Sequence, residues 1–286
     1  MNRHPLRPIV LLGALLLVAA GPALGSGPIA QPSGGRLIYL PLIVAPSACP
    51  ATSGNGYAAG PAYQRDNDNP VRLAWNHADK NLALRGYQSN PGAFKGFVNY
   101  GTNDPTQPPQ LATLFSPYRV PAFTSAYEVF NWNWLPSPNP GTRGSLDTQW
   151  GVTVLGLATA RGEALRVPVS GYSLGQGMSV IVLYADANSI TFKYTRDDSV
   201  APNGYTLHVD NLCTDPNLLA LYHALDTGAR YIYRGPSYNL PNLPAGQLFG
   251  TARGAEVRVA IVDSGAFMDP RSCGDWWEIR PGRGCP

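Results

Sequence analysis

The chain has 286 residues, of which only 14% are charged, and its formal net charge is +3 at pH 7. This weak charge, with no basic run, excludes the electrostatic footprint expected of a nucleic-acid-binding protein. The 31 glycines and 28 prolines favour short strands and turns over long helices. The composition therefore predicts a mostly β protein that does not bind nucleic acid.

The first 25 residues have the three parts of a secretory signal peptide. Arg3 and Arg7 supply the positive charge, an apolar run covers 9–20, and the small residues at 23–25 offer a cleavage site. The apolar run is shorter than the roughly 20 residues that a membrane-spanning helix needs, and no later stretch is long enough. We therefore expect a protein that is secreted or held at the cell surface, with no membrane span after cleavage.

Four cysteines, at positions 49, 213, 273 and 285, are typical of two disulfide bonds in an exported chain. Four cysteines allow three pairings, and the sequence does not decide among them. We favour Cys273–Cys285, which would close a short tail at 273–286, and Cys49–Cys213, which would join the N-terminal segment to the core. The cysteine pattern fits no zinc site, because no histidine lies close to the pair at 273 and 285.

The N-terminal half is rich in turn signals. Residues 26–56 contain much Gly, Pro, Ser and Ala and are typical of a linker, interrupted by an apolar run at 37–44. Pro41 excludes a central strand in that run, which is therefore either an edge strand or an exposed adhesive segment.

Residues 57–145 predict a small aromatic-rich β module, and the sequence leaves open whether this module packs on the C-terminal core. Its predicted strands are 83–87, 94–100 and 126–134.

Residues 146–272 contain the clearest strand signals. Runs of β-branched and aromatic residues, bounded by Gly, Asn and Asp, predict strands at 152–157, 165–169, 180–185, 189–194, 205–209 and 256–262. Residues 187–188 predict a tight turn between two of these strands. One helix is predicted at 215–227, because Asp215 and Pro216 form a typical helix start and an apolar stripe follows them.

Several short motifs in this region carry a resemblance to a known family. They are Gly162–Val167 with Gly171-Tyr172, the strand Tyr205–Val209, the corner Gly246–Gly250, and Glu256–Ile261 followed by Asp269-Pro270. On these motifs, residues 150–270 resemble the lysostaphin-like (LytM-type) zinc endopeptidases, which cut peptide cross-links in bacterial cell walls. The resemblance implies a β-sandwich or barrel-like core with one short inserted helix.

The residues that hold zinc in that family are absent here. Its first ligand pair, His-x-x-x-Asp, corresponds to 149–156, which contains neither residue. Its His-x-His pair corresponds to Glu256 and Arg258, and an arginine cannot bind a metal because it stays protonated. His208 matches a family histidine that assists catalysis without binding zinc. We therefore expect a degenerate peptidase with no metal, no cofactor and no catalysis of this type.

The motif Gly-Tyr-Ser-Leu-Gly at 171–175 has a functional and a structural interpretation. It matches the nucleophile elbow of serine hydrolases, with Ser173 as the nucleophile and Asp186 or Asp197 and then His208 in the order of the partners. A nucleophile elbow needs a helix directly after the serine. More glycine and another strand follow instead, so we favour a glycine-rich β-turn.

Two other motifs also favour a structural interpretation. Residues 263–265 match the Asp-Ser-Gly loop of aspartic proteases, but those enzymes pair two such loops and no second copy occurs. A hairpin turn is therefore favoured there. The Asp and Asn residues at 66–69 offer oxygen ligands for calcium, but the glycine and glutamate of an EF-hand loop are absent, and turn capping is the favoured interpretation.

An aromatic strand offers a possible sugar-binding platform. Trp132 and Trp134 alternate with Asn131 and Asn133, so the two indoles should share one face of the strand. Exposed aromatic rings stack on the C–H faces of sugars, and nearby amides suit the hydroxyls. The competing interpretation is that both indoles belong to the core.

Three functional hypotheses follow. The first is a secreted, non-catalytic protein that binds peptidoglycan or another extracellular polysaccharide through Trp132, Trp134, His208 and Arg258, the last of which could pair with a carboxylate of a wall peptide. The second is an active hydrolase, either a rearranged metallopeptidase or an enzyme based on Ser173. The third is a structural secreted protein that assembles through residues 37–44.

Overall fold

The computed structural model describes residues 49–65, 73–101, 108–135, 141–201, 203–226 and 237–281. All of them belong to one unit of the chain, Ser47–Pro286. The predicted signal peptide at 1–25, the apolar segment at 37–44 and the candidate calcium ligands at 66–69 lie outside the described residues.

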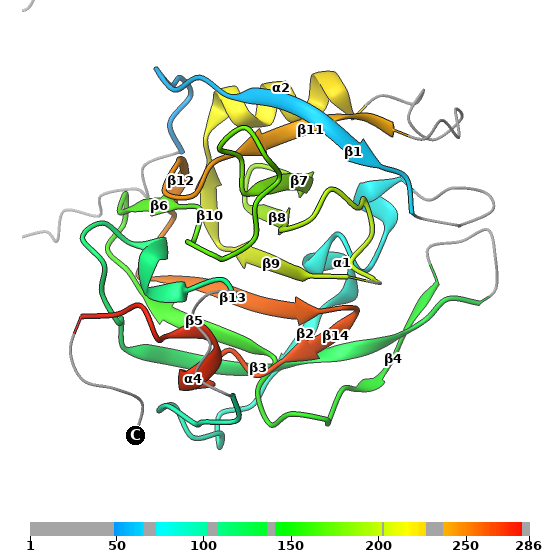
Figure 1. Ribbon diagram of the computed structural model, residues 1–286. Coiled ribbons are helices and arrows are strands. Elements are labelled where there is room, and N and C mark those ends of the chain that lie inside the picture. Colours follow the sequence, from blue (N-terminus) through cyan, green and yellow to red (C-terminus); the bar gives the residue numbers. More distant parts are fainter. Residues whose placement is uncertain are drawn as a thin grey trace, which may run out of the picture. The chain divides into compact units, whose positions relative to one another are not determined.

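Most strands form one large antiparallel sheet, which agrees with the mostly β composition (Figure 1). The order of its strands is β1–β11–β7–β8–β9–β13–β5–β3–β2, with β14 beside β13 and β4 beside β3. The strands are β1 (Ala58–Tyr63), β2 (Tyr87–Ser89), β3 (Phe123–Asn133), β4 (Thr142–Leu146), β5 (Val154–Ala158), β7 (Val180–Ala185), β8 (Ser189–Lys193), β9 (Tyr205–Asp210), β11 (Ser237–Leu243), β13 (Glu256–Asp263) and β14 (Ala266–Met268).

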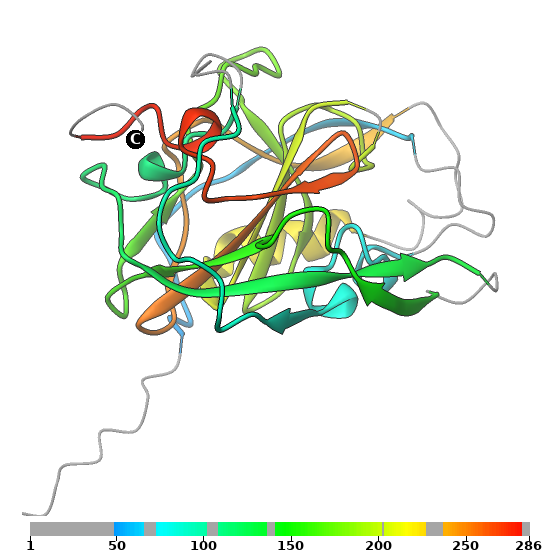
Figure 2. The same cartoon turned by 90° about the horizontal axis from the view of Figure 1, so that it is seen from below.

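A smaller sheet and several short helices complete the described fold. The smaller sheet has the order β10–β12–β6, with β6 (Ala164–Arg166), β10 (Leu212–Thr214) and β12 (Leu248–Ala252). The α-helices are α1 (Leu82–Arg85), α2 (Pro216–Leu225) and α4 (Cys273–Trp276), and the 3-10 helices are η1 (Ala74–Asn76) and η2 (Leu111–Leu114). Figure 2 shows α2 in yellow and α4 in red, well apart in this view as in the first.

The two faces of the large sheet differ in chemistry because side chains alternate along each strand. One face carries apolar residues such as Phe192, Val209 and Val259, which are fully buried in the main core. The opposite face carries a smaller apolar cluster that includes Val154 and Ala260. The same face also carries polar residues, and we call it the polar face. Its polar residues on β8, β9 and β13 are Ser189, Thr191, Lys193, Thr206, His208, Asp210, Glu256 and Arg258.

The region at 57–145 shares the large sheet with the region that follows it. β1 pairs with β11, where Gly60 lies opposite Leu240. β3 pairs with β5, where Ala126 lies opposite Leu155. The structure thus decides a question that the sequence leaves open, because the aromatic-rich region packs on the C-terminal core.

Several predicted elements are confirmed with small shifts at their ends. The predicted strands at 126–134, 152–157, 180–185, 189–194, 205–209 and 256–262 correspond to β3, β5, β7, β8, β9 and β13. The predicted helix corresponds to α2, and the Asp215 carboxylate accepts hydrogen bonds from the N–H groups of Asn217 and Leu218. The predicted strand at 165–169 ends at Arg166, and Pro168, which lacks an N–H donor, follows shortly after.

Two predicted strands are wrong. Most of 83–87 is the helix α1, because the Asn81 side chain accepts a hydrogen bond from Leu84 N at 3.1 Å and Gly86 ends the helix with a φ of +77°. Residues 94–100 form no strand, and only Val98 makes an isolated bridge, to Ser272. This extended segment runs beside the C-terminal part of the chain and pairs with no strand of the sheet.

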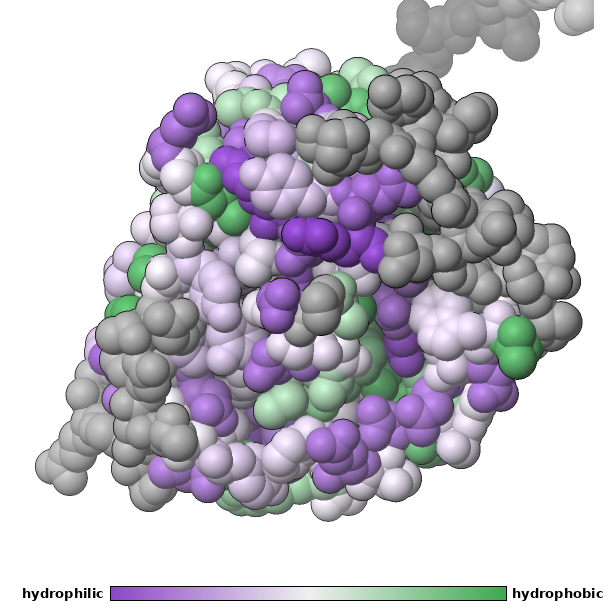
Figure 3. All heavy atoms as spheres, turned by 45° about the vertical axis from the view of Figure 1, so that its right-hand side comes forward, coloured by the Kyte–Doolittle hydropathy of each residue, from purple (hydrophilic) through white to green (hydrophobic). Residues whose placement is uncertain are grey.

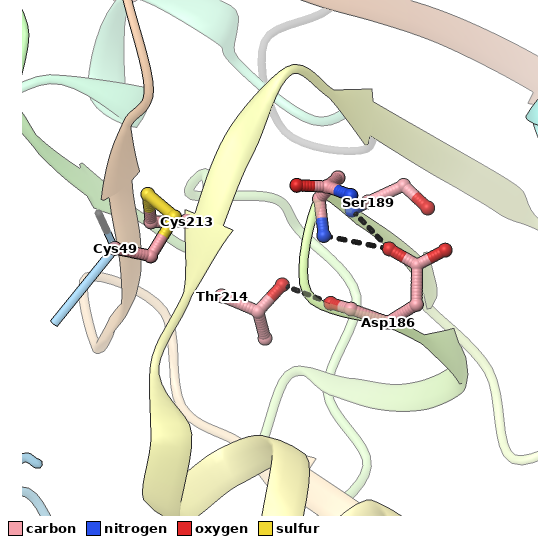
Figure 4. The surroundings of a disulfide bond; sticks show 6 residues. Cys49, Asp186, Ser189, Cys213 and Thr214 are labelled. Atoms are coloured by element: carbon pink, nitrogen blue, oxygen red, sulfur yellow. Dashed lines mark hydrogen bonds between the residues drawn. A yellow bond between two sulfur atoms is a disulfide. The ribbon is translucent and has the colours of Figure 1, made fainter. Parts of the chain in front are cut away.

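The Cys49–Cys213 disulfide is confirmed and ties the first described residues to β10 (Figure 4). Next to it, Thr214 Oγ1 donates to the Asp186 carbonyl oxygen at 2.5 Å. The Asp186 carboxylate in turn accepts from Asn188 N and Ser189 N and closes the predicted turn between β7 and β8 (Figure 4). Cys285 lies outside the described residues, so Cys273–Cys285 stays a prediction.

Candidate functional site

A row of mostly polar residues crosses the polar face of the sheet. Strand pairing places Ser125 of β3 opposite Gly156 of β5, Gly156 opposite Arg258 of β13, and Arg258 opposite Asp210 of β9. Ser189 of β8 lies opposite Asp210 and completes the row. Five neighbouring strands therefore bring together residues that are up to about half the chain apart in sequence. Arg258 of this row contacts Tyr87, Tyr127 and Glu256, and Asp210 contacts Tyr87. We call Tyr87, Tyr127, Asp210, Glu256 and Arg258 the Arg258 site.

Gly156 makes room for a carboxylate above the sheet. A Cβ atom at this position would collide with Ser125 Oγ and Glu256 Oε2. Without it, Glu256 Oε2 lies over β5 and accepts hydrogen bonds from Ser125 Oγ, at 2.6 Å, and from Thr124 Oγ1. Burial opposes ionisation of Glu256, but these hydrogen bonds and the neighbouring Arg258 outweigh it and lower the pKa of Glu256.

Arg258 bonds directly to one acidic residue of the site, Glu256, and is linked to the other, Asp210, only through the Tyr87 hydroxyl. Its Nε donates to Glu256 Oε1 at 2.9 Å, and its Nη1 donates to the Tyr87 hydroxyl at 3.1 Å. The guanidinium carbon lies 4.9 Å from the ring centre of Tyr127, within the range of a cation–π contact. The Arg258 side chain is 32% exposed, so the group is fixed in position but still meets solvent.

Asp210 is the least satisfied polar group of the site. Its Oδ2 accepts a hydrogen bond from the Tyr87 hydroxyl at 3.3 Å, whereas its buried Oδ1 has no partner among the described residues. Burial raises the pKa of Asp210 to about 7, against the lowering effects of Tyr87 and Arg258. At neutral pH the site therefore contains an ionised Glu256 and an Asp210 that is partly protonated.

His208 lies beside this row but is fully buried. Thr191 Oγ1 donates to the Lys80 carbonyl oxygen at 2.7 Å, so it must accept from His208 Nδ1–H at 2.9 Å. This assignment leaves Nε2 as an unprotonated nitrogen, which has no partner among the described residues. Burial, and then the charge of Arg85, lower the pKa of His208 to about 3. The histidine is therefore neutral and closed off from solvent.

The residues at the positions of the family's zinc ligands do not fit a zinc ion. Arg258 is a cation that is already bonded to Glu256, and the segment 149–156 contains neither His nor Asp. Within the described part of the chain, no three His, Cys, Asp or Glu residues are grouped as metal ligands. We derive no metal chemistry at this site.

The two tryptophans that the sequence predicts to bind a sugar do not belong to the Arg258 site. Trp132 and Trp134 are both half-buried, and their ring centres are 6.3 Å apart with planes inclined by 64°. Trp134 also meets the ring of His77, edge to face, at 5.0 Å. The indoles therefore form a tilted cluster and no flat platform. Trp132 is five residues beyond Tyr127 on β3, which corresponds to roughly 17 Å along a strand.

Ser173 lies in a turn without the features of a nucleophile elbow. Its Oγ accepts a hydrogen bond from Gly175 N at 3.1 Å, and Leu174 N donates to Met178 O across the turn. Gly175 and Gly177 have positive φ angles, and no helix follows. The structure therefore does not bring Ser173 and the buried His208 into a catalytic arrangement.

The Asp-Ser-Gly motif at 263–265 is a hairpin turn. Asp263 and Ala266 pair across the hairpin of β13 and β14, and Ser264 and Gly265 between them have φ angles of 48° and 95°. These positive values are typical of a two-residue hairpin loop. The structural interpretation of the motif is confirmed.

Sequence reasoning missed Tyr87, Tyr127 and Asp210. Asp210 could have been found, because Thr206, His208 and Asp210 alternate with apolar residues and must share one face of their strand. Tyr87 and Tyr127 gave no such signal. They join the site only through the pairing of β2 with β3 and of β3 with β5.

The described surface has mixed polarity. Figure 3 shows hydrophilic residues across the middle of one face and only small hydrophobic areas. Large apolar side chains that are well exposed among the described residues are Tyr63, Trp75, Phe94, Tyr100, Tyr118 and Leu135. Among the same residues, no helix has both the length and the apolar character needed to cross a bilayer.

Comparisons of the chain with protein family models, with curated proteins and with solved structures found no match. The resemblance to lysostaphin-like peptidases therefore depends on the short motifs described above.

Proposed function

We propose that this protein is a secreted, non-catalytic protein of the cell envelope or extracellular space that binds a glycan at the Arg258 site. The observation that carries the proposal is the partly exposed side chain of Arg258, which is fixed by Glu256 and Tyr87 over the ring of Tyr127. Fixed charged groups beside aromatic rings suit sugars, which present hydroxyls together with C–H faces.

The charges of the site favour a neutral sugar over the carboxylate of a wall peptide. Glu256 already pairs with Arg258 at 2.9 Å, and Asp210 adds further negative charge when it ionises. The site therefore has no surplus positive charge to attract an anion. Sugar hydroxyls both donate and accept, so they can bond to the carboxylates as well as to the guanidinium.

The strand order supports a lysostaphin-type core in which the metal site has been replaced. If the resemblance holds, the positions of the zinc ligands and of the catalytic histidine must lie close together. Glu256 and Arg258, at the positions of the His-x-His pair, lie on β13, and His208 lies on the neighbouring strand β9. The segment 149–156, which corresponds to the first ligand pair, runs into β5 on the other side of β13. The disulfide between Cys49 and Cys213 is compatible with export to an oxidising compartment.

Co-sedimentation tests the proposal. The mature chain, from residue 26, is mixed with insoluble peptidoglycan, cellulose and chitin, and the bound fraction is measured against the amount of polysaccharide. We expect binding to at least one polymer, and about tenfold weaker binding for Arg258→Gln, since a hydrogen bond to a charged group is lost. Arg253→Gln, which changes an exposed arginine outside the site, is the matched control. Wild-type protein that stays in solution with every polymer would contradict the proposal.

The buried carboxyl group of Asp210 is the observation that favours a second candidate function, hydrolysis. A buried carboxyl group with a free oxygen and a pKa near 7 suits a general acid, and the ionised Glu256 lies in the same site. Mass spectrometry of the co-sedimentation supernatant separates the two functions. Released sugars or muropeptides that disappear with Asp210→Asn would establish hydrolysis, whereas binding without fragments supports the non-catalytic function.

A further inference from the structure

A pocket lies where three distant segments meet, away from the Arg258 site. It has a volume of about 310 Å³, and its walls come from the end of β1 with Arg65, from the turn at 172–174 and from residues 194–197, which follow β8. This size lies at the lower end of the range of ligand pockets, which starts at roughly 300 Å³. The pocket shares no residue with the Arg258 site and includes the Ser173 turn, for which the proposed function has no role.

Arg196 holds the walls of this pocket together. Its Nη1 donates to Pro61 O at 2.9 Å, and its Nε donates to Leu174 O at 3.2 Å. Its main-chain carbonyl accepts from Tyr63 N at 2.6 Å. One residue therefore ties together all three segments, and the pocket is formed before any ligand arrives. Preformed walls reduce the entropy cost of binding.

The charge of the pocket is positive. The charged side chains that line it are two guanidinium groups, of Arg65 and Arg196, and the carboxylate of Asp197, which gives the lining a formal charge of +1, while the buried Asp198 carboxylate accepts from Arg65 N behind it. Arg65 Nε pairs with Asp197 Oδ1 at 2.9 Å, but the Arg65 side chain is 58% exposed. The side-chain partners of Arg196 among the described residues are carbonyl oxygens, which do not neutralise its charge. An anionic group is therefore attracted to this pocket.

The remaining wall suits a sugar ring. Tyr63 is 42% exposed at the rim. Tyr172 is held edge to face against Tyr205, with ring centres 5.7 Å apart. Ser173 and Thr195 add hydroxyl groups to the lining. Aromatic rings pack against the C–H faces of a pyranose, and hydroxyls and guanidinium groups bond to its polar substituents.

We propose that this pocket binds a carboxylated sugar, of the hexuronic-acid class, with the ring against Tyr63 and Tyr172 and the carboxylate toward Arg65. The site is independent of the Arg258 site, so either can fail without the other. A guanidinium group recognises a carboxylate through paired hydrogen bonds, which distinguishes an acidic sugar from its neutral counterpart.

Nuclear magnetic resonance titration of the mature chain with sodium glucuronate tests the proposal. We expect saturable amide shifts centred on Tyr63, Ser173 and Asp197, with a Kd on the order of 1 mM for a ligand of this size. Methyl glucoside, which lacks the carboxylate, and sodium lactate, which lacks the ring, should each bind about tenfold more weakly. Glucuronate that causes no shifts at the pocket would overturn the proposal, as would equal binding of either control compound.

Variants of two pocket residues test whether glucuronate binds in this pocket. Arg65→Gln and Tyr63→Ser change exposed side chains, so the fold should survive, and each should weaken glucuronate binding by about tenfold. Arg253→Gln, outside the pocket, should leave the affinity unchanged. Equal affinity in the wild type and in both pocket variants would show that the ligand binds elsewhere and would overturn the assignment.

Discussion

Gly156 controls the position of the Glu256 carboxylate. In Gly156→Ala the added Cβ meets Ser125 Oγ and Glu256 Oε2, so the carboxylate must leave the place where it bonds to Arg258. We expect glycan binding to fall by about tenfold, the loss associated with one charge-assisted hydrogen bond, while the protein stays folded. Co-sedimentation measures the binding, and circular dichroism measures the fold.

Gly254→Ala is the matched control, because no atom lies within 4 Å of its added Cβ. It lies two residues before Glu256 and should bind glycan like the wild type. Equal binding by Gly156→Ala and Gly254→Ala would show that the Glu256–Arg258 pair does not contribute to the site.

Asp210 and His208 have opposite effects on stability between about pH 4 and 6.5. The pKa of Asp210 is raised to about 7, so its contribution is present below the unfolded value of about 3.9 and is lost as the pH rises to 7. The pKa of His208 is lowered to about 3, so its contribution is present above about 6.5 and is lost as the pH falls. We therefore expect the two pH dependences of the free energy of unfolding largely to cancel in the wild type.

In Asp210→Asn, the pH dependence of the free energy of unfolding that His208 causes should no longer be cancelled by Asp210. The free energy of unfolding of this variant should rise from pH 4.5 to 6.5 more steeply than that of the wild type, by up to about 1.4 kcal/mol per pH unit. Urea denaturation at three pH values measures the difference. Parallel pH profiles of the two proteins would mean that Asp210 does not retain its proton in the folded state.

Some residues of the site follow from the sequence, and others depend on strand pairing. The motif resemblance singled out Glu256, Arg258 and His208, because these residues stand at marked positions of a recognisable pattern. Tyr87 and Tyr127 belong to strands that are distant in sequence, and their register against β3 and β5 decides their place. The tautomer of His208 also depends on the main chain of Lys80, because the Lys80 carbonyl oxygen takes the hydroxyl proton of Thr191, and no local pattern indicates this contact.

At the scale of single elements, the start of α2 depends on Asp215. Its carboxylate accepts hydrogen bonds from Asn217 N, and also from Ser53 Oγ and Asn55 Nδ2, both at 2.6 Å. Asp215→Ala should lower the free energy of unfolding by about 2 kcal/mol, because it removes the helix cap and the anchor of the segment before β1.

Asp215→Asn keeps an oxygen that can cap the helix and should lose less than Asp215→Ala. His223→Ala changes an exposed residue of the same helix and should stay within about 0.5 kcal/mol of the wild type. The midpoints of urea denaturation compare the three variants. A loss in Asp215→Ala no larger than that in His223→Ala would contradict this role of the cap.

Elements with strong local signals were predicted well, whereas elements that depend on distant partners were not. The cap and proline at the start of α2 and the β-branched run of β7 are local signals, and both elements lie close to the predicted bounds. The segment 94–100 has the composition of a strand, but it lies beside Arg271 and Cys273 and bonds to their main chain. Local composition could not show this placement.

At the scale of the described fold, the Cys49–Cys213 disulfide closes a loop with a sequence separation of 164 residues. Such a loop restricts the unfolded chain strongly. The double variant Cys49→Ser/Cys213→Ser should therefore lose about 3–5 kcal/mol of unfolding free energy. Urea denaturation under oxidising conditions measures the loss, and a change below about 1 kcal/mol would contradict the expectation.

The measurement that tests the central claim most directly is a glycan array probed in parallel with the wild type, Arg258→Gln and Arg253→Gln. We predict that the wild type and Arg253→Gln bind the same neutral glycans and that Arg258→Gln loses those signals. Neutral-glycan signals that persist unchanged in Arg258→Gln, or an array to which the wild type does not bind, would contradict glycan binding at the Arg258 site.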